Sequence, residues 1–446
     1  MRPPQVPLDV QRYPLAPPEL QLEQVHVFIR HGERTPVGVR MSEPPASIPE
    51  HWMMCKTGRQ FRAAVAGALT QVEANGIAAR KDALPAETLA VKRVVERIDG
   101  TSVEGECMLG ELTDVGRQST YNYGRALRKL YVERLGFLPD TVTKQNEIYL
   151  RSTNMPRTIE SLQQITHGLY PSSKFENGIT PRLFIRNGKD ENMLGNTFAC
   201  KRLEILLVGF AQAAASAYNH LLEPLDKKLS QYIGGNPIRI DGKPRASGIL
   251  DTIRACTAHG VKVPPEFEDK SVVDTIEKAV VNEWFADKTE EVRRLAMGRM
   301  LDDMMRKMTG KLMKGPANPL KILLHSTHDT SIAAICSTLD VFDEKWPAFT
   351  ASITFELFSR RDTPPQQSYL QSVYGAVSPF TGKSRTPESY VRMRYQNKNM
   401  ILPFCAEEGK HFPGSPELCS LAAFKERVKE LTPADWESEC APAGRP

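Results

Sequence analysis

Three strand-like segments, far apart in the chain, each run directly into charged or imidazole side chains. Residues 25–30 alternate Val and Ile with other side chains, as strands do, and continue into the motif RHGERTP. Residues 147–153 end in Arg-Ser-Thr, and residues 320–329 form an apolar run that ends in His-Asp. Such a run is typical of a strand buried on both faces of a parallel sheet. Because parallel strands end at one edge of their sheet, these polar groups are predicted to converge there.

Helical patterns separate the strands. The segment 112–131 predicts a helix capped by Thr113, and the segment after residue 153 predicts another helix that stops before Pro171. Strands that alternate with helices are typical of α/β folds. We therefore predict an α/β fold with a mixed, mainly parallel sheet flanked by helices.

Residues 200–313 lack this alternation and are mostly helical by pattern. A methionine stripe within residues 301–312 is typical of a core and not of a ligand site. The apolar stretch at 203–218 is interrupted by polar residues, so it predicts a packed helix and no membrane span. The predicted divisions are an extended, proline-rich segment at 1–21, an α/β core at 22–190 and 315–446, and an inserted helical cap at 191–314.

Charge and leader patterns restrict the partners and the location. A net charge of +5 in 446 residues, without a Lys/Arg run, predicts no nucleic-acid partner, although local clusters can still bind an acidic small molecule. Residues 1–21 have no apolar region of the kind found in secretory signals, and the chain has no N-glycosylation sequon. These features favour an intracellular location, cytoplasmic or mitochondrial. The sequence indicates no oligomeric state.

The groups at the strand ends fit the chemistry of a phosphate monoester. Arginine offers paired donors that match phosphate oxygens and stays charged, so we predict phosphate binding by Arg30, Arg34 and Arg151. Three cations around one point repel each other unless an anion lies among them. No metal and no cofactor is predicted.

The same groups suggest a covalent mechanism. His31 is the predicted nucleophile, because nearby cations keep its imidazole neutral and its phosphorylated form is open to attack by water. Asp329 is the predicted general acid for the leaving alkoxide, which predicts an acid pH optimum. His328 is expected to donate to a phosphoryl oxygen, and Gly32 to let the backbone approach the bound group.

These motifs, in this order, resemble the histidine acid phosphatase family, which is branch 2 of the histidine phosphatase superfamily. RHGERTP at 30–36 resembles its RHGxRxP motif, YLRSTNMPRTIESL at 149–162 its arginine before a helix, HSTHDT at 325–330 its late HD, and LTDVGRQ at 112–118 the start of a family helix. The resemblance spans roughly residues 22–440. It implies a phosphoglycerate mutase-like fold with a cap and is closer to lysosomal or prostatic acid phosphatases than to fungal phytases. The roles it implies are a nucleophile (His31), a proton donor (Asp329) and phosphate contacts (Arg30, Arg34, Arg151, His328).

Eight dispersed cysteines without a CxxC motif exclude zinc-ribbon and thioredoxin sites. The resemblance implies that Cys200 pairs with Cys440 and Cys405 with Cys419, and buried thiols are the alternative. The partner position that the resemblance assigns to Cys256 is occupied by Ser352. The insertion at 41–110 and the loop at 359–387 depart from the family and are expected to shape the pocket mouth.

Other interpretations of single motifs are weaker. TGKS at 381–384 lacks the strand and the first glycine of a P-loop. A metal-dependent HD hydrolase would use His325 and the HD pair but would not explain the arginines, so His325 is expected to pack in its strand. Glu33 is expected to be exposed at the rim. The remaining histidines are expected to be surface or core residues (His26, His51, His167, His220, His259, His411).

The predicted function is therefore an acid phosphomonoesterase acting on a small-molecule phosphate monoester. One alternative is a specialist on the same fold, for phytate or for a lysophospholipid such as lysophosphatidate. A wide basic mouth would favour phytate and an apolar mouth would favour the lipid. Another alternative is a phosphate-binding protein that has lost catalysis.

Overall fold

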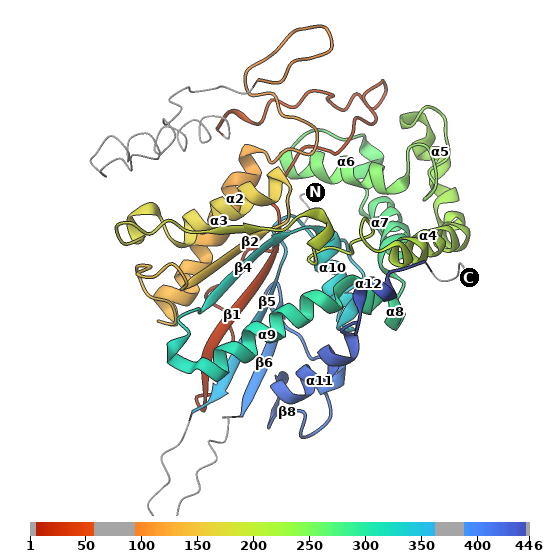
Figure 1. The fold of residues 1–446 in the computed structure, drawn as a ribbon. Helices are drawn as coiled ribbons and strands as arrows, with labels where there is room; N and C mark the ends of the chain where they lie inside the picture. The colour runs from red at the N-terminus through yellow and green to blue at the C-terminus, as the bar shows by residue number, and fades with distance from the viewer. Residues whose placement is uncertain (1–5, 58–93, 362–387, 443–446) are drawn as a thin grey trace, which may run out of the picture.

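The computed structural model describes residues 6–57, 94–361 and 388–442, which build a nine-stranded mixed sheet between layers of helices (Figure 1). The strand order is β3-β2-β4-β1-β5-β6-β9-β8, with β7 paired to β6. The strands are β1 (Leu20–Arg30), β2 (Ile148–Ser152), β3 (Leu183–Ile185), β4 (Ile322–Thr327), β5 (Ser352–Arg360), β6 (Ser389–Tyr395), β7 (Lys398–Asn399), β8 (His411–Phe412) and β9 (Ser415–Ser420).

Parallel pairing among the described strands is confined to one half of the sheet. β2 pairs in parallel with β3 and β4, and β4 pairs in parallel with β1, whereas β5, β6, β8 and β9 pair antiparallel. The predicted mixed sheet flanked by helices is confirmed, but its antiparallel share is larger than a mainly parallel sheet would have. The β8–β9 hairpin illustrates the reason, because a short turn can join only antiparallel neighbours.

Helices cover both faces of this sheet. The helices are α2 (Asp114–Leu127), α3 (Pro156–Leu169), α4 (Lys201–Leu222), α5 (Asp226–Leu229), α6 (Ala246–His259), α7 (Lys270–Phe285), α8 (Glu290–Arg293), α9 (Arg299–Lys314), α10 (Asp329–Thr338), α11 (Leu421–Leu431) and α12 (Trp436–Glu439). Val25, Val27 and Ile29 of β1 pack with α2 and α3, whereas Phe28 packs with α9, α10 and α11. The period of two in β1 therefore assigns alternate side chains to opposite helical layers.

The methionine stripe lies in the core, as predicted. Met304, Met305 and Met308 of α9 are buried in one cluster with Phe28 of β1 and Phe355 of β5. Helix α9 therefore covers the sheet, although the predicted cap extends to residue 314. The division into core and cap stays a prediction.

A second hydrophobic core joins the helices on the right of Figure 1. It contains buried side chains of α6 and α7 together with Ile48, Trp52 and Cys55 from the insertion after residue 41. Cys55 forms a disulfide with Cys107, a pair that the sequence did not predict. This insertion thus packs on the cap helices, beside the edge of the sheet where β1, β2 and β4 end.

Helix α4 differs from its prediction. It contacts α7, but most of its surface faces outward, and its buried residues are Leu203, Ala214, Ala215 and Leu222. The helical stretch that begins with α4 and continues to residue 232 contains an apolar 18-residue window with a mean hydropathy of 1.3 and, by length and composition alone, could cross a membrane. Only 17% of its most apolar window is buried, so the expected packing is limited to one side.

The N-terminal segment is anchored more firmly than its proline-rich sequence predicts. Residues 6–19 form no helix or strand, in agreement with an extended segment, but Tyr13 is buried and donates a hydrogen bond of 2.7 Å to Glu356 of β5. Arg392 of β6 binds the other oxygen of Glu356 at 2.8 Å. A buried carboxylate needs such partners, so this network ties the segment to the sheet.

The described cysteines form three disulfides. Both pairings implied by the resemblance, Cys200–Cys440 and Cys405–Cys419, are present. Cys256 is a buried free thiol, as is Cys336.

Candidate active site

The three strand ends lie in register at one edge of the sheet. Arg30, the last residue of β1, pairs with Thr327 of β4, and Ser152 of β2 pairs with Ser326 of β4. The backbone N–H of His31 donates to the carbonyl of Thr327 at 3.0 Å. The predicted convergence of these ends is therefore confirmed.

His31 is held in one tautomer. Its Nδ1 lies 2.8 Å from the carbonyl oxygen of Gly32, which can only accept, so Nδ1 carries the hydrogen and Nε2 keeps its lone pair. Burial and then the charges of Arg30 and Arg34 lower the pKa of His31 well below its ordinary value. The imidazole is therefore neutral and its Nε2 is available as a nucleophile.

The loop after His31 is locked against the start of α2. A Cβ on Gly32 would lie 2.4 Å from the carbonyl oxygen of Gly116, so only glycine allows this approach. The predicted cap is confirmed, because the Thr113 side chain accepts from the N–H of Gly116. Gly32 thus serves the packing of the loop on α2, where the sequence suggested space for a ligand.

The prediction that Glu33 is exposed at the rim is wrong. Glu33 is fully buried, and its backbone carbonyl accepts from the N–H of Thr113 at 3.0 Å. The start of α2 packs directly on this loop, because a Cβ on Gly116 would lie 2.1 Å from the carbonyl oxygen of Glu33. Burial raises the pKa of Glu33.

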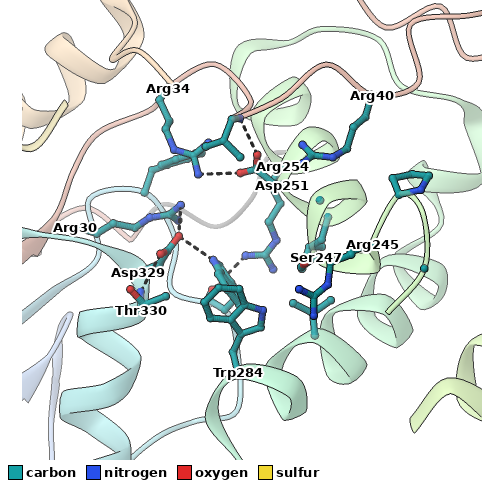
Figure 2. Close-up of a pocket in the computed structure, with 18 of the residues that line it drawn as sticks. Arg30, Arg34, Arg40, Arg245, Ser247, Asp251, Arg254, Trp284, Asp329 and Thr330 are labelled. Carbon is teal, nitrogen blue, oxygen red and sulfur yellow. Dashed lines mark hydrogen bonds and ion pairs between the residues drawn. The ribbon is translucent and has the colours of Figure 1, made fainter. Parts of the chain in front are cut away.

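Each arginine of the RHGERTP motif forms an ion pair with a carboxylate. Arg30 contacts Asp329 at 2.7 Å, and Arg34 contacts Asp251 of α6 at 2.8 Å (Figure 2). The ring of Phe349 lies 4.1 Å from the Arg30 guanidinium and 5.8 Å from that of Arg34. Both cations are therefore oriented and charge-balanced before a phosphate arrives.

Asp329 is ionised in this arrangement. Burial raises its pKa, but Arg30, Arg34 and other nearby donors outweigh burial and lower it to about 2. The predicted acid pH optimum therefore cannot come from a proton that Asp329 holds at rest. To act as the predicted acid, Asp329 would have to receive a proton during the reaction.

His328 lies beside the nucleophile. The rings of His31 and His328 are 5.6 Å apart, and the Nε2 of His328 lies 2.9 Å from the hydroxyl of Thr153. Burial and then Arg157 lower the pKa of His328 to about 4. His328 is thus placed to contact the same bound group as His31.

Arg151 does not face this group, which corrects the sequence prediction. It pairs in register with His325, so its side chain projects toward α9, where it contacts Glu191 at 2.7 Å and Asp303 at 3.6 Å. Adjacent positions of a strand point to opposite faces, and the Arg151 position points away from His31.

Arg157 takes the place expected for Arg151. It is the second residue of α3, which begins at the strand edge, and its charge acts on both His31 and His328. Arg157 forms no ion pair with any described residue. Its position in the first turn of a helix that follows the second strand was the sequence signal that could have identified it.

The segment 346–350 also builds the site, and the sequence gave no signal for it. The carbonyl of Pro347 accepts from Arg30 at 2.6 Å, and the N–H of Thr350 donates to the carbonyl of His31 at 3.2 Å. The indole N–H of Trp346 donates to Asp329 at 3.1 Å. This segment therefore contacts the arginine, the nucleophile and the predicted acid.

A cavity of about 490 Å³ opens between these groups and helices α6 and α7. Figure 2 shows Arg40, Arg245 and Arg254 around it, with Trp284 at one side. Arg254 pairs with Glu277 and Arg245 with Glu283, whereas Arg40 and Lys243 form no ion pair with a described residue. The mouth therefore carries positive charge beyond the phosphate-binding arginines.

The described residues contain no group of three His, Cys, Asp or Glu side chains with the geometry of a metal site. His325 packs in β4, where its ring stacks on Phe28 at 4.4 Å, as predicted. The TGKS segment at 381–384 lies outside the described residues.

Comparisons with known proteins agree with this geometry. Residues 21–396 match the model of the histidine phosphatase superfamily (branch 2). The chain is 34% identical to a probable acid phosphatase of Schizosaccharomyces pombe, over 96% of this chain and 95% of that protein. It is 27% identical to the lysophosphatidic acid phosphatase type 6 of Mus musculus, over 64% of this chain and 65% of that protein. Its fold is similar to the phytase of Citrobacter braakii, with a TM-score of 0.55 at 15% identity, over 94% of this chain and 99% of that chain.

Proposed function

This chain belongs to branch 2 of the histidine phosphatase superfamily, and on that premise we propose that it is an acid phosphomonoesterase that acts through a phosphohistidine on His31. The observation that carries the proposal is the Nδ1 hydrogen bond of His31 to Gly32, which leaves Nε2 free beside Arg30, Arg34 and Arg157. A neutral nucleophile among cations suits a phosphate group, whose negative charge those cations stabilise.

In the first step, Nε2 of His31 attacks phosphorus as the ester P–O bond breaks, and Asp329 gives its proton to the leaving alkoxide. In the second step, water attacks phosphorus as the P–N bond to His31 breaks, the proton of the water passes to Asp329, and inorganic phosphate and free His31 form. Arg30, Arg34, Arg157 and His328 bind the phosphoryl oxygens in both steps. This chemistry needs one proton on Asp329 when the ester bond breaks.

The substrate can supply that proton. Phosphate monoesters lose their second proton at a pKa near ~6, so the monoanion predominates at acid pH. Binding draws Arg30 toward the phosphate and away from Asp329, which raises the pKa of Asp329 and lets it take the proton of the monoanion. An acid optimum then follows from the protonation state of the substrate, although Asp329 is ionised at rest.

The test is hydrolysis of p-nitrophenyl phosphate at acid pH with a chelator present. We expect His31→Ala to lose activity by about 10³-fold or more, because the nucleophile is removed, while His220→Ala, an exposed histidine of α4, keeps it. Rapid acid-free quenching of Asp329→Asn should trap phosphate on His31, because hydrolysis of the intermediate lacks its base. Full activity in His31→Ala would contradict the proposal, and inert wild type at every pH would identify a phosphate-binding protein.

The mouth supports a compact, multiply anionic substrate more than a lysophospholipid. Arg40 and Lys243 offer positive charge without a described carboxylate partner. The exposed apolar side chains of Val37 and Trp284 also line the cavity, so the preference for an anionic substrate rests on these two cations. A phytate-like substrate would use those cations, whereas an acyl chain would leave them unpaired.

A further inference from the structure

The carboxyl group of Asp329 accepts hydrogen bonds from three described donors, and we expect substrate binding to affect each of these bonds differently. Oδ2 accepts from Arg30 at 2.7 Å and from the indole N–H of Trp346 at 3.1 Å. Oδ1 accepts from the N–H of Thr330 at 2.8 Å, a bond within the same turn of chain. Arg30 is needed by the incoming phosphate, so its contact with Asp329 weakens during catalysis. Trp346 is the tertiary contact that remains.

Helices α6 and α7 hold the backbone of Trp346 through both its N–H and its carbonyl group. Its N–H donates to Glu277 of α7 at 2.7 Å, and its carbonyl accepts from Arg254 of α6 at 3.2 Å. Arg254 and Glu277 contact each other at 2.7 Å, so one ion pair brackets the residue. Backbone atoms clamped by two helices leave little freedom to the side chain.

The indole ring is fixed as well. Its ring centre lies 5.9 Å from that of Trp284 and 5.3 Å from that of Phe285, both on α7. Aromatic contacts at these separations define the orientation of the ring and of its N–H. The N–H therefore points at Asp329 because α6 and α7 hold the indole there.

We propose that Trp346 is a positioning residue, through which helices α6 and α7 hold the carboxyl group of Asp329 toward the leaving oxygen. The proposal rests on the proposed function, in which Asp329 protonates that oxygen. A carboxyl group held only by its own turn would rotate once Arg30 moves to the phosphate, and proton transfer requires the donor within hydrogen-bond distance.

The dependence on the leaving group tests this role. An alkyl phosphate releases an alkoxide that needs a proton, whereas p-nitrophenyl phosphate releases a stable anion that does not. We expect Trp346→Phe to lower kcat/KM for glycerol 2-phosphate about tenfold and for p-nitrophenyl phosphate less than about twofold, because only proton donation is impaired. The parameter kcat/KM reports the step in which the ester bond breaks, whatever the rate of the second step.

A matched control separates this effect from the general loss of an indole hydrogen bond. Trp436 donates its indole N–H to the carbonyl of Leu295 at 3.0 Å, away from the cavity, so Trp436→Phe should leave the ratio of the two substrates unchanged. Glu277→Gln removes the charge that holds the backbone of Trp346 and keeps the side-chain volume. Glu277→Gln should change the ratio of kcat/KM for the two substrates in the same direction as Trp346→Phe, by a smaller factor. This variant provides the test if Trp346→Phe does not fold.

An equal loss of kcat/KM for both substrates in Trp346→Phe and in Glu277→Gln would overturn the proposal and leave Trp346 a structural residue. Wild type that hydrolyses neither substrate would instead overturn the proposed function. The two failures are therefore distinguishable in one set of assays.

Discussion

At the scale of single residues, the site balances its own charge before substrate arrives. Asp329 pairs with Arg30 and Asp251 with Arg34, which are two of the three arginines that the sequence assigns to phosphate. Ion pairs of buried groups are costly to break, so a weakly charged ligand cannot displace them. A phosphate group, with several oxygens and a negative charge, can replace the carboxylates at both arginines.

Arg157 and Arg151 provide a direct test of which arginine binds phosphate. We expect Arg157→Gln to lower kcat/KM for p-nitrophenyl phosphate by about 10²-fold, because it removes a cation from the transition state. We expect Arg151→Gln to keep kcat/KM of the folded protein within about threefold and to lower the free energy of unfolding by about 3 kcal/mol, because Glu191 and Asp303 lose their buried partner.

The assay for this comparison combines kinetics with thermal unfolding of both variants. The reverse pattern, with activity lost in Arg151→Gln and retained in Arg157→Gln, would return the phosphate contact to Arg151 and contradict the placement of the two side chains.

At the scale of elements, neighbouring strands β1 and β4 carry two buried histidines in the sheet. The rings of His26 and His325 are stacked with centres 6.0 Å apart, and neither ring nitrogen of His325 has a hydrogen-bond partner among the described residues. Burial lowers the pKa of His26 to about 3 and that of His325 well below its ordinary value. Both are neutral in the folded protein.

These histidines make the fold sensitive to acid. In the unfolded chain they bind protons below pH ~6.5, whereas in the folded protein they do not, so stability is complete above that pH and falls as the pH decreases. Each contributes a loss of about 1.4 kcal/mol per pH unit until its folded pKa is reached. If the protein works at acid pH, as proposed, this loss of stability sets a lower limit to its usable pH range.

Replacing His325 with phenylalanine should remove one of the two contributions. The ring of His325 stacks on Phe28 and forms no hydrogen bond with a described residue, so His325→Phe should change stability little at pH 8. At pH 5 we expect it to raise the free energy of unfolding by about 2 kcal/mol over wild type. Urea denaturation at both pH values measures this, and an equal change at pH 8 and pH 5 would show that His325 does not titrate on unfolding.

At the scale of the whole molecule, the cavity is made by two parts that are distant in sequence. The edge of the sheet supplies the chemistry, whereas the segment directly after the RHGERTP motif and helices α6 and α7 supply the mouth. Arg40 packs on α6 at Gly248, where a Cβ would lie 2.4 Å from Nε of Arg40. Helix α6 thus helps to position a cation that the sheet alone could not place.

This arrangement predicts a preference for substrates with a second anionic group. Glycerol 3-phosphate and 3-phosphoglycerate share the phosphate ester and differ in one terminal group, a neutral hydroxymethyl group or a carboxylate. We expect wild type to favour 3-phosphoglycerate about fivefold in kcat/KM, and Arg40→Gln to lose most of that preference, because a partly exposed ion pair contributes up to about 1 kcal/mol.

Two further variants sharpen the comparison. Gly248→Ala should displace the Arg40 side chain and reduce the preference without changing net charge, whereas Lys425→Gln, an exposed cation of α11, should have no effect. A preference that survives both Arg40→Gln and Gly248→Ala would mean that the second anion does not bind at the mouth.

The sequence by itself determined the features that depend on local pattern. The period of β1, the buried run of β4 and the Thr113 cap predicted strands and helices, and the common edge of parallel strands then brought His31, His328 and Asp329 together. These predictions hold because period and capping act within a few residues of chain.

Only the tertiary structure decided which side chains face the site from elsewhere. Neighbouring positions of a strand point to opposite faces of the sheet, so the sequence motif alone could not show that Arg151 points away from His31. It also could not show that Arg157, in the next helix, lies near His31 in its place. Trp346 and Asp251 reach the predicted acid and Arg34 from elements that no local pattern links to them. Glu33 is buried because α2 closes over its loop, and α4 is exposed because it packs mainly on α7 and leaves its other side uncovered. Contacts between distant segments depend on how elements pack, and packing is a property of the whole chain.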